Sequence, residues 1–305
     1  MRACFVDAGD GLAAVMERLR RPSDVPVTVN RQPDIRPDAL PGVLAGHGIA
    51  IIDHTALPTA IAKQVPSLKH VVFLGTGARS YMNPEELAAE CGVAVHIIKG
   101  YGDTAVAEMA FALMWAAAKG LCRMDRGIRG GQWLRTDGVE LTGKTVGLIG
   151  YGGIGAEMAR LCNGAGMRVI AWNRSPREAP GVDFVELDDL LSQSDVVSVH
   201  LLLNDETRGF LSTDRIARMK PGAILVNTAR GAVVDEAAME AAARAGRIRV
   251  ALDVYGTEPL PAGASIATVE DATLSAHSAF RTPEASDNLI EAALEHCRRI
   301  AREGK

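Results

Sequence analysis

A glycine-rich turn between a strand and a helix constrains this chain more than any other feature. Gly150-Tyr151-Gly152-Gly153-Ile154-Gly155 follows the apolar run 146–149 and precedes a helical pattern over about 154–163. In that context the glycines permit a tight turn, a close approach of pyrophosphate and close helix–strand packing. The helix N-terminus adds unpaired N–H groups for phosphate. Tyr151, Gly152, Gly153 and Ile154 are therefore predicted to contact a dinucleotide, although a glycine turn without a ligand is the alternative.

The end of the next strand, expected over 168–172, bears on which dinucleotide binds. Asn173 stands where an aspartate would hold the ribose hydroxyls of NAD, and Arg174 and Ser175 follow. A carboxylate would repel a 2′-phosphate, whereas a guanidinium pairs with it. These residues predict that NADP(H) is preferred and that NAD(H) is possible. The alternative is that Arg174 is only a solvated loop residue.

Strand-like and helix-like patterns alternate along the chain, which favours parallel α/β domains. Its length of 305 residues is typical of two domains. A helix over 84–91 is expected, with Asn83 as its cap and Pro84 in its first turn. Further helices are expected over 236–244 and 285–302. The other expected strands are 50–52, 70–74, 93–98, 146–149, 196–200, 224–227 and 250–254.

The segment 104–141 combines a long apolar helix with a glycine- and arginine-rich stretch. Residues 104–119 place apolar side chains around more than one side of a helix, as expected at a domain junction or subunit interface. Residues 120–141 have no clear period and contain Trp133, so they are expected to form an extended arm or loop.

Composition excludes several classes of protein. The net charge is −4 and aromatic residues make up 4% of the chain, which argues against binding of nucleic acid. The five scattered cysteines suggest neither a disulfide framework nor a metal site and fit a reducing compartment. The first ten residues lack the apolar run of a signal peptide, and the most apolar stretch, 109–118, is about half a membrane span. A cytoplasmic protein without a membrane segment is expected.

Three polar side chains follow the ends of later strands in the second α/β series. Arg230 lies in Asn227-Thr228-Ala229-Arg230-Gly231, and His277 lies in Ser275-Ala276-His277. Glu258 follows the expected strand 250–254, which contains Asp253. Ligands of open α/β sheets bind beyond the carboxyl ends of the strands. Each of the three could instead be structural, since a lone histidine or a loop carboxylate usually is.

These motifs, in this order, resemble the D-isomer-specific 2-hydroxyacid dehydrogenase family over about residues 70–285. The resemblance implies two Rossmann-like or flavodoxin-like α/β domains, with the cofactor domain (99–281) inserted into a discontinuous substrate domain (1–98 and 282–305). It also implies a homodimer formed through the helix and arm at 104–141. Arg230 matches the substrate-binding arginine, Glu258 the catalytic carboxylate and His277 the acid/base. It assigns Thr76, Gly77 and Ala78 to the substrate carboxylate, Thr228 and Ala229 to the cofactor, and Asp253 to the nicotinamide amide.

The implied reaction transfers hydride between NADP(H) and a small 2-oxo or D-2-hydroxy acid, such as glyoxylate or hydroxypyruvate. His277 would donate the proton, while Glu258 would fix its tautomer and Arg230 would hold the substrate carboxylate. An NAD-linked enzyme acting on phosphoglycerate or a bulkier 2-hydroxy acid is the alternative, as is a nucleotide-sensing relative without activity. The sequence departs from the family where Ser-Ala-His replaces Thr-Pro-His. Phe280 and Arg281 also replace small residues, and either favour particular substrates or point into the domain junction.

Overall fold

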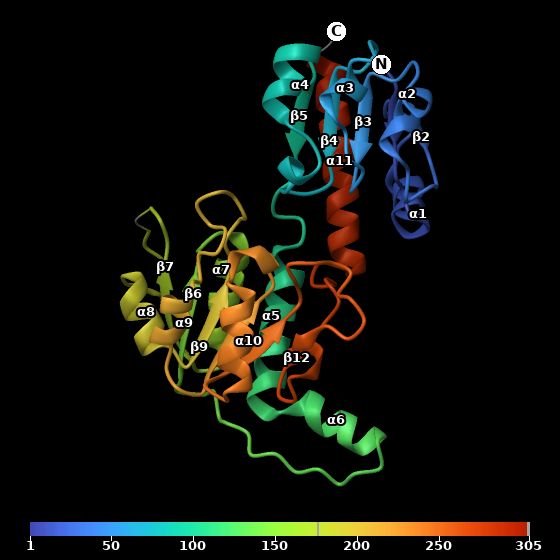
Figure 1. Ribbon diagram of the computed structural model, residues 1–305. Helices are drawn as coiled ribbons and strands as arrows, with labels where there is room; N and C mark the ends of the chain where they lie inside the picture. Colours follow the sequence, from blue (N-terminus) through green and yellow to red (C-terminus); the bar gives the residue numbers. More distant parts are fainter. Residues whose placement is uncertain (176, 304–305) are drawn as a thin grey trace. The chain divides into compact units, whose positions relative to one another are not determined.

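The computed structural model describes residues 1–175 and 177–303 as two α/β units (Figure 1). Unit 1 comprises Met1–Gly102 and Arg281–Lys305, and unit 2 comprises Asp103–Phe280. The chain thus passes from one unit to the other after residue 102 and again after residue 280, where the sequence suggested 98 and 281. Both units contain parallel strands with helices between them, which confirms the predicted fold class.

Unit 2 contains a seven-stranded sheet in which every strand pair is parallel. The strand order is β12-β11-β10-β9-β6-β7-β8, so the order reverses between β6 and β9. A reversal of this kind opens a crevice at the carboxyl ends of the strands, where dinucleotides bind in this topology. The strands are β6 (Thr145–Ile149), β7 (Arg168–Trp172), β8 (Asp183–Phe184), β9 (Val196–Val199), β10 (Ala223–Asn227), β11 (Ile248–Leu252) and β12 (Thr273–Leu274).

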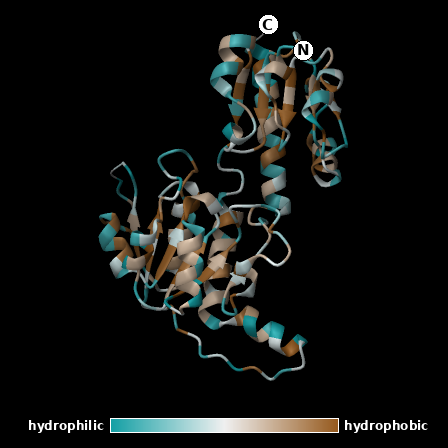
Figure 2. Ribbon diagram, viewed as in Figure 1, coloured by the Kyte–Doolittle hydropathy of each residue, from teal (hydrophilic) through white to brown (hydrophobic). Residues whose placement is uncertain are grey.

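Helices cover both faces of this sheet because its strands are apolar on both sides. Val146 and Leu148 of β6 pack toward α5 and α7, whereas Ile149 lies in the cluster formed with α8, α9 and α10. Figure 2 shows the result, with apolar strands inside and hydrophilic residues on the outer helices. The helices are α5 (Asp103–Lys119), α6 (Leu121–Arg129), α7 (Gly153–Gly164), α8 (Leu187–Gln193), α9 (Thr213–Arg218) and α10 (Glu236–Arg244), with 3-10 turns at Gly231–Val233 and Ser265–Thr268.

Unit 1 contains a five-stranded parallel sheet of order β2-β1-β3-β4-β5, the flavodoxin-like arrangement. Phe5, Ile49 and Ile51 pack on α1 and α11, and the alternate residues Cys4 and Ile52 lie in the cluster on the other face. The strands are β1 (Ala3–Phe5), β2 (Val27–Val29), β3 (Ile49–Ile52), β4 (His70–Phe73) and β5 (Ala94–Ile97). The helices are α1 (Asp10–Leu19), α2 (Leu40–Val43), α3 (Thr59–Ala62), α4 (Pro84–Cys91) and α11 (Pro283–Glu303), with 3-10 turns at Pro37–Ala39 and Ala78–Ser80.

Two local expectations have different outcomes. The cap of α4 is confirmed, because the Asn83 side-chain oxygen accepts a hydrogen bond from the Glu86 N–H at 3.3 Å. The expectation that residues 120–141 lack helical structure is wrong for 121–129, which form α6. Gly120, with φ of 63°, ends α5 and lets the chain turn into α6. An Asp125–Arg129 ion pair and contacts of Arg123 with Glu270 and Asp271 stabilise α6.

Among the described residues, no single helix has the length and apolar character needed to cross a membrane. Helices α5 and α6 have that length and apolar character only when taken together, and the chain bends by 68° between them. Seven residues of α5 are buried within unit 2, as in the core helix of a globular domain.

Candidate active site

The glycine turn between β6 and α7 forms a cradle that an added side chain would fill. Gly150 has φ of 97°, and a Cβ there would lie 2.7 Å from the carbonyl oxygen of His200. A Cβ on Gly155 would lie 2.4 Å from the Gly150 carbonyl oxygen, whereas one on Gly152 would meet nothing within 4 Å. The turn is therefore closely packed on the protein side and open at Gly152, where α7 begins. These residues fit the pyrophosphate of a dinucleotide.

The end of β7 carries the residues that were predicted to distinguish the two cofactors. The Asn173 side chain accepts a hydrogen bond from the Tyr151 N–H at 3.2 Å and donates one to the Ser175 carbonyl at 3.0 Å. Its amide thus joins this loop to the glycine turn. Arg174 forms an ion pair with Glu206 at 2.7 Å, and both side chains are largely exposed. Sequence reasoning did not identify Glu206 as a neighbour of this loop.

Two buried polar atoms near the cofactor edge have no hydrogen-bond partner among the described residues. They are Oγ1 of Thr228 and Nδ1 of His200. Burial lowers the pKa of His200 to about 4, so its ring is neutral at pH 7. Its Nε2 lies 3.0 Å from the Ser198 hydroxyl. Unsatisfied polar atoms of this kind call for an explanation, and a bound nucleotide would supply partners.

His277 and Glu258 form the pair that the motifs predicted. His277 Nδ1 lies 2.5 Å from Glu258 Oε2, and a carboxylate can only accept, so Nδ1 donates. This leaves Nε2 of the partly exposed ring available to a substrate. The other oxygen of Glu258 accepts from the Tyr255 N–H at 2.8 Å, which holds the carboxylate in place.

Arg230 lies on a neighbouring loop beyond β10. The Asn227 side chain fixes this loop by accepting from the Ala229 N–H and donating to the Arg230 carbonyl, both at 3.0 Å. A Cβ on Gly231 would lie 2.1 Å from the carbonyl carbon of Tyr255, so the loop packs against the segment leading to Glu258. Within the described chain, no hydrogen bond or ion pair joins Arg230 to Glu258 or His277; its guanidinium donates to the Ala229 carbonyl.

Asp253 lies one residue beyond β11, where the sequence had suggested that the strand continues to 254. Its carboxylate has no exposed surface and is surrounded by the segment that carries His277. Oδ1 accepts from the Ser275 hydroxyl at 2.6 Å and from the Ser278 N–H at 3.0 Å, and Oδ2 accepts from the Ala279 N–H at 2.9 Å. The sequence had assigned Asp253 to the nicotinamide amide. Among the described residues, its side-chain hydrogen bonds are with Ser275, Ser278 and Ala279 of unit 2.

In unit 1, the loop after β4 presents unpaired backbone donors. Gly75 has φ of 148°, and the N–H groups of Thr76, Gly77 and Ala78 make no hydrogen bond among the described residues. Consecutive free N–H groups at a strand end form an anion-binding concavity. This arrangement suits the carboxylate role expected for these three residues.

The switch point of the unit 1 sheet, between β1 and β3, carries an acidic network that sequence reasoning missed. Asp7 is fully buried and accepts from the N–H groups of Asp53, His54 and Thr55 at 2.7–2.9 Å. A hydrogen bond with Asp53 raises the pKa of His54 to about 9. The only sequence signal is that these residues directly follow the apolar runs of two strands.

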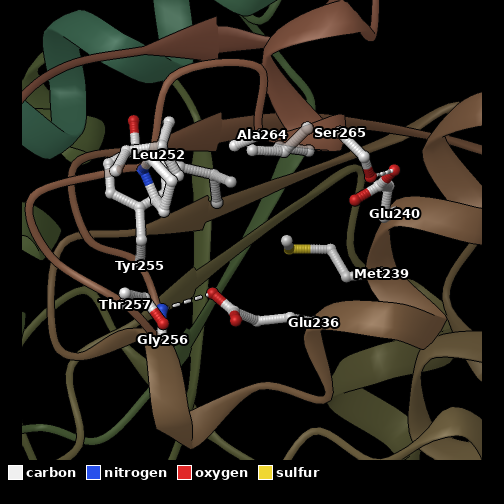
Figure 3. A pocket seen from close by; sticks show the side chains of 12 residues that line it. Glu236, Met239, Glu240, Leu252, Tyr255, Gly256, Thr257, Ala264 and Ser265 are labelled. Atoms are coloured by element: carbon white, nitrogen blue, oxygen red, sulfur yellow. Dashed lines mark hydrogen bonds between the residues drawn. The ribbon is translucent and has the colours of Figure 1, made fainter.

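A cavity of about 200 Å³ lies in unit 2 between α10 and the segment 255–266. Figure 3 shows Glu236, Met239, Leu252 and Tyr255 around it, with the Glu236 carboxylate accepting from the Gly256 N–H at 2.5 Å. Arg230, Glu258 and His277 do not line it. The cavity thus lies beside the loop that leads to Glu258 rather than at the His277 pair. Within the described residues no group of three or more His, Cys, Asp or Glu side chains could hold a metal ion.

Comparison with known proteins agrees with this geometry. Residues 111–279 match the model of the D-isomer specific 2-hydroxyacid dehydrogenase NAD binding domain. A glyoxylate reductase from Aeropyrum pernix is 36% identical over 250 residues, which cover 77% of this chain and 74% of that protein. A D-3-phosphoglycerate dehydrogenase from Archaeoglobus fulgidus is 35% identical over 248 residues, covering 79% of this chain.

The matched region spans only 47% of that phosphoglycerate dehydrogenase. Among solved structures, an acyclic imino acid reductase in complex with NADPH and D-arginine is 25% identical, with a TM-score of 0.87 and coverage of 99% of this chain and 98% of the other. The family model covers the glycine turn and the segments of Arg230, Glu258 and His277. The chain belongs to the D-isomer-specific 2-hydroxyacid dehydrogenase family.

Proposed function

We propose that this protein is an NADP(H)-preferring oxidoreductase that reduces a small 2-oxo acid, such as glyoxylate or hydroxypyruvate. The observation that carries the proposal is the hydrogen-bonded His277–Glu258 pair, which lies beyond the carboxyl ends of the strands of unit 2. In the same sheet, the turn between β6 and α7 is the glycine cradle that is open at Gly152. The similarity to the glyoxylate reductase from Aeropyrum pernix supports the same substrate class.

In this mechanism the bound nicotinamide supplies the hydride, and the protein's residues manage charge and protons. His277 donates a proton from Nε2 to the carbonyl oxygen as negative charge develops there, and in the reverse direction it accepts that proton. Glu258 keeps the Nδ1 proton in place and stabilises the charged ring. Arg230 pairs with the substrate carboxylate and polarises the carbonyl. In unit 1, the free N–H groups of Thr76, Gly77 and Ala78 form a concavity that suits a carboxylate.

The charges of unit 1 favour a substrate without a phosphate group. Asp7 and Asp53 accompany His54 at the switch point, and Arg79 on the next loop is paired with Glu85. A phosphate dianion is bound most strongly by unpaired cations that form bidentate contacts. For this reason we place phosphoglycerate second, although the Archaeoglobus fulgidus relative bears that activity in its name.

The proposed cofactor preference rests on Asn173 and Arg174. The Asn173 side chain is hydrogen-bonded to the backbone of Tyr151 and Ser175. Asn173 thus stands where a carboxylate would bind the free ribose hydroxyls of NAD. Arg174 is exposed and can pair with a 2′-phosphate. The imino acid reductase of the same fold was solved with NADPH, which is consistent with this preference.

The proposed assembly is a homodimer formed through α5, α6 and the arm that follows. Of the six large apolar side chains that are exposed among the described residues, four lie in this segment: Leu121, Ile128, Trp133 and Val139. Exposed apolar groups gathered in one segment mark an interface. We also propose a cytoplasmic location, because all five cysteines are free thiols and burial raises the pKa of Cys162 to about 12.

The deciding experiment follows oxidation of NADPH and NADH at 340 nm with a panel of 2-oxo acids. We expect turnover of glyoxylate or hydroxypyruvate with NADPH, and a fall in kcat of roughly 10²- to 10⁴-fold for His277→Ala, since general acid catalysis contributes that much. His296→Ala, on α11 of unit 1, controls for loss of an imidazole and should keep the wild-type rate. Tight NADPH binding without turnover of any acid would identify a nucleotide sensor instead and contradict the proposal.

A further inference from the structure

A carboxylate lies against the glycine cradle, and sequence reasoning did not identify it. Asp103 is the first residue of α5 and of unit 2, and Gly153 is the first residue of α7. A Cβ on Gly153 would overlap Oδ2 of Asp103, whereas one on Gly152 would meet nothing within 4 Å. Glycine at position 153 therefore leaves the room that the Asp103 carboxylate occupies beside the start of α7.

This carboxylate has no partner that would neutralise it. Among the described residues, the Asp103 side chain forms no hydrogen bond and no ion pair. It is half-buried, and burial is the one cause that shifts its pKa, which it raises. Placing a charge out of water without a partner is unfavourable. The compensation on hand is the partial positive charge at the N-termini of α5 and α7.

The N-terminus of α7 is also the part of the cradle that suits a pyrophosphate. Phosphates bind there because the first N–H groups of a helix are unpaired and the helix dipole favours negative charge. The N-cap of α7, Gly152, has no side chain to satisfy those N–H groups, and the turn 150–155 contains no lysine or arginine. A bound pyrophosphate and the Asp103 carboxylate would thus be two anions at one helix end. Like charges repel more strongly where water is partly excluded.

We propose that Asp103 sets the affinity of the cradle for its dinucleotide: the ionised carboxylate beside Gly153 repels the pyrophosphate and speeds its release. This inference rests on the proposed function, because it requires a dinucleotide in the cradle. The pyrophosphate is common to NADPH and NADH. Asp103 therefore acts on both cofactors alike, in contrast to Arg174, which faces only the 2′-phosphate.

Asp103→Asn is the central test, because it removes the charge and keeps the shape of the side chain. We expect the Kd values of NADPH and NADH to fall about 5- to 20-fold each, with their ratio unchanged to within about twofold, as for one partly screened repulsion. Calorimetry without a 2-oxo acid measures both. Stopped-flow displacement of NADPH should show that most of the gain lies in slower dissociation. Because a partly unfolded variant would bind less tightly, misfolding cannot produce this result.

Three comparisons isolate the charge of Asp103 and its target. Asp103→Ala adds no hydrogen-bond donor and should also bind NADPH more tightly, whereas Asp103→Glu keeps the charge and should not. Glu108→Gln removes an exposed charge further along α5, where it acts on Arg160, and should leave the Kd unchanged. The ligand 2′-AMP has no pyrophosphate, so wild type and Asp103→Asn should bind it equally.

Opposite results would overturn the inference. Weaker NADPH binding by Asp103→Asn and Asp103→Ala would show that the carboxylate accepts a hydrogen bond from the cofactor, and unchanged Kd values would show that it plays no part. A gain with Asn alone would reflect a new hydrogen bond rather than a lost repulsion. If the wild type bound neither cofactor measurably, binding acquired by both neutral variants would support the inference, and its continued absence would refute it. Failure to turn over any 2-oxo acid would contradict the proposed function but leave these binding comparisons valid.

Discussion

Among single residues, Arg174 has two possible partners, and this competition bears on cofactor preference. Its guanidinium pairs with Glu206 at 2.7 Å, with side chains 77% and 71% exposed. Exposed pairs of this kind contribute about 0–1 kcal/mol, so a 2′-phosphate can replace Glu206 as the partner of Arg174. The displaced carboxylate would still lie near a dianion and repel it. Glu206 would therefore weaken the proposed preference for NADPH that rests on Arg174.

We expect Glu206→Gln to raise the NADPH-to-NADH ratio of kcat/KM by about three- to tenfold, the effect of losing one solvent-screened repulsion. Arg174→Ala should abolish the preference. Calorimetry with 2′,5′-ADP and 5′-AMP tests the phosphate contact without turnover. Glu178→Gln is the matched control, since Glu178 is exposed on the same loop and has no ion pair among the described residues. An unchanged ratio in Glu206→Gln would show that Glu206 plays no part.

Some of the site could be predicted from the sequence because its motifs have local signatures. The glycine turn has a fixed spacing, and His277 and Glu258 follow recognisable strand ends. The partners of Asp253 could not be predicted in this way. They depend on how β12 pairs beside β11, and β12 has only two residues and no period of its own. The Arg174–Glu206 pair joins loops 32 residues apart and has no local signal either.

Among the elements, β4, β5 and α11 bring three histidines together in unit 1. His70 Nδ1 lies 3.2 Å from His96 Nε2, and the rings of His96 and His296 are 5.6 Å apart. Arg299 lies within 3.3 Å of both His96 and His296. Burial, followed by these neighbouring positive charges, lowers the pKa of His96 to about 4. Burial also lowers the pKa of His70 and His296, while Glu303 and Glu295 on α11 act in the opposite direction.

Unit 1 should therefore lose stability as the pH falls from about 6.5 toward 4. In this window the unfolded chain, with histidine pKa near 6.5, binds protons that folded His96 does not, so protonation favours unfolding. We expect a loss on the order of 1–2 kcal/mol after allowing for solvent screening. Hydrogen exchange of β4, β5 and α11, corrected for its intrinsic pH dependence, measures it. His96→Gln should remove most of the loss, and an equal slope in both proteins would refute this account.

The elements that sequence reasoning missed are short or amphipathic. β1 has three residues, which is too few to show a period, although it occupies the second position of its sheet. The helix α6 was missed because Gly120, Gly127, Gly130 and Gly131 obscure its pattern. Its contacts with Glu270 and Asp271 stabilise it, and they come from residues far along the chain. The bounds of buried strands such as β7 and β10 were predicted to within one residue, because a short apolar run bounded by turn residues is typical of a buried strand.

At the scale of the whole molecule, the proposed homodimer would form through α6 and the arm that follows it. Ile128 is 54% exposed and Trp133 is 79% exposed, and tryptophan is a frequent centre of binding energy at interfaces. We expect the double variant Ile128→Asp with Trp133→Asp to weaken dimerisation about 30-fold or more, as seen by light scattering after gel filtration. Leu202→Asp, which changes an exposed leucine outside this segment, should leave the mass unchanged. Wild-type protein that is monomeric at every concentration would contradict the proposed dimer.

The two-segment origin of unit 1 has a consequence for protein synthesis. Its sheet buries Phe5, Ile49 and Ile51 against α11, and α11 is translated only after all of unit 2. At about 5–20 residues per second, the first segment waits roughly 10–40 s on the ribosome for its covering helix. During that interval its apolar face is open to chaperones and to other nascent chains, whereas unit 2 is continuous and can fold as soon as it emerges.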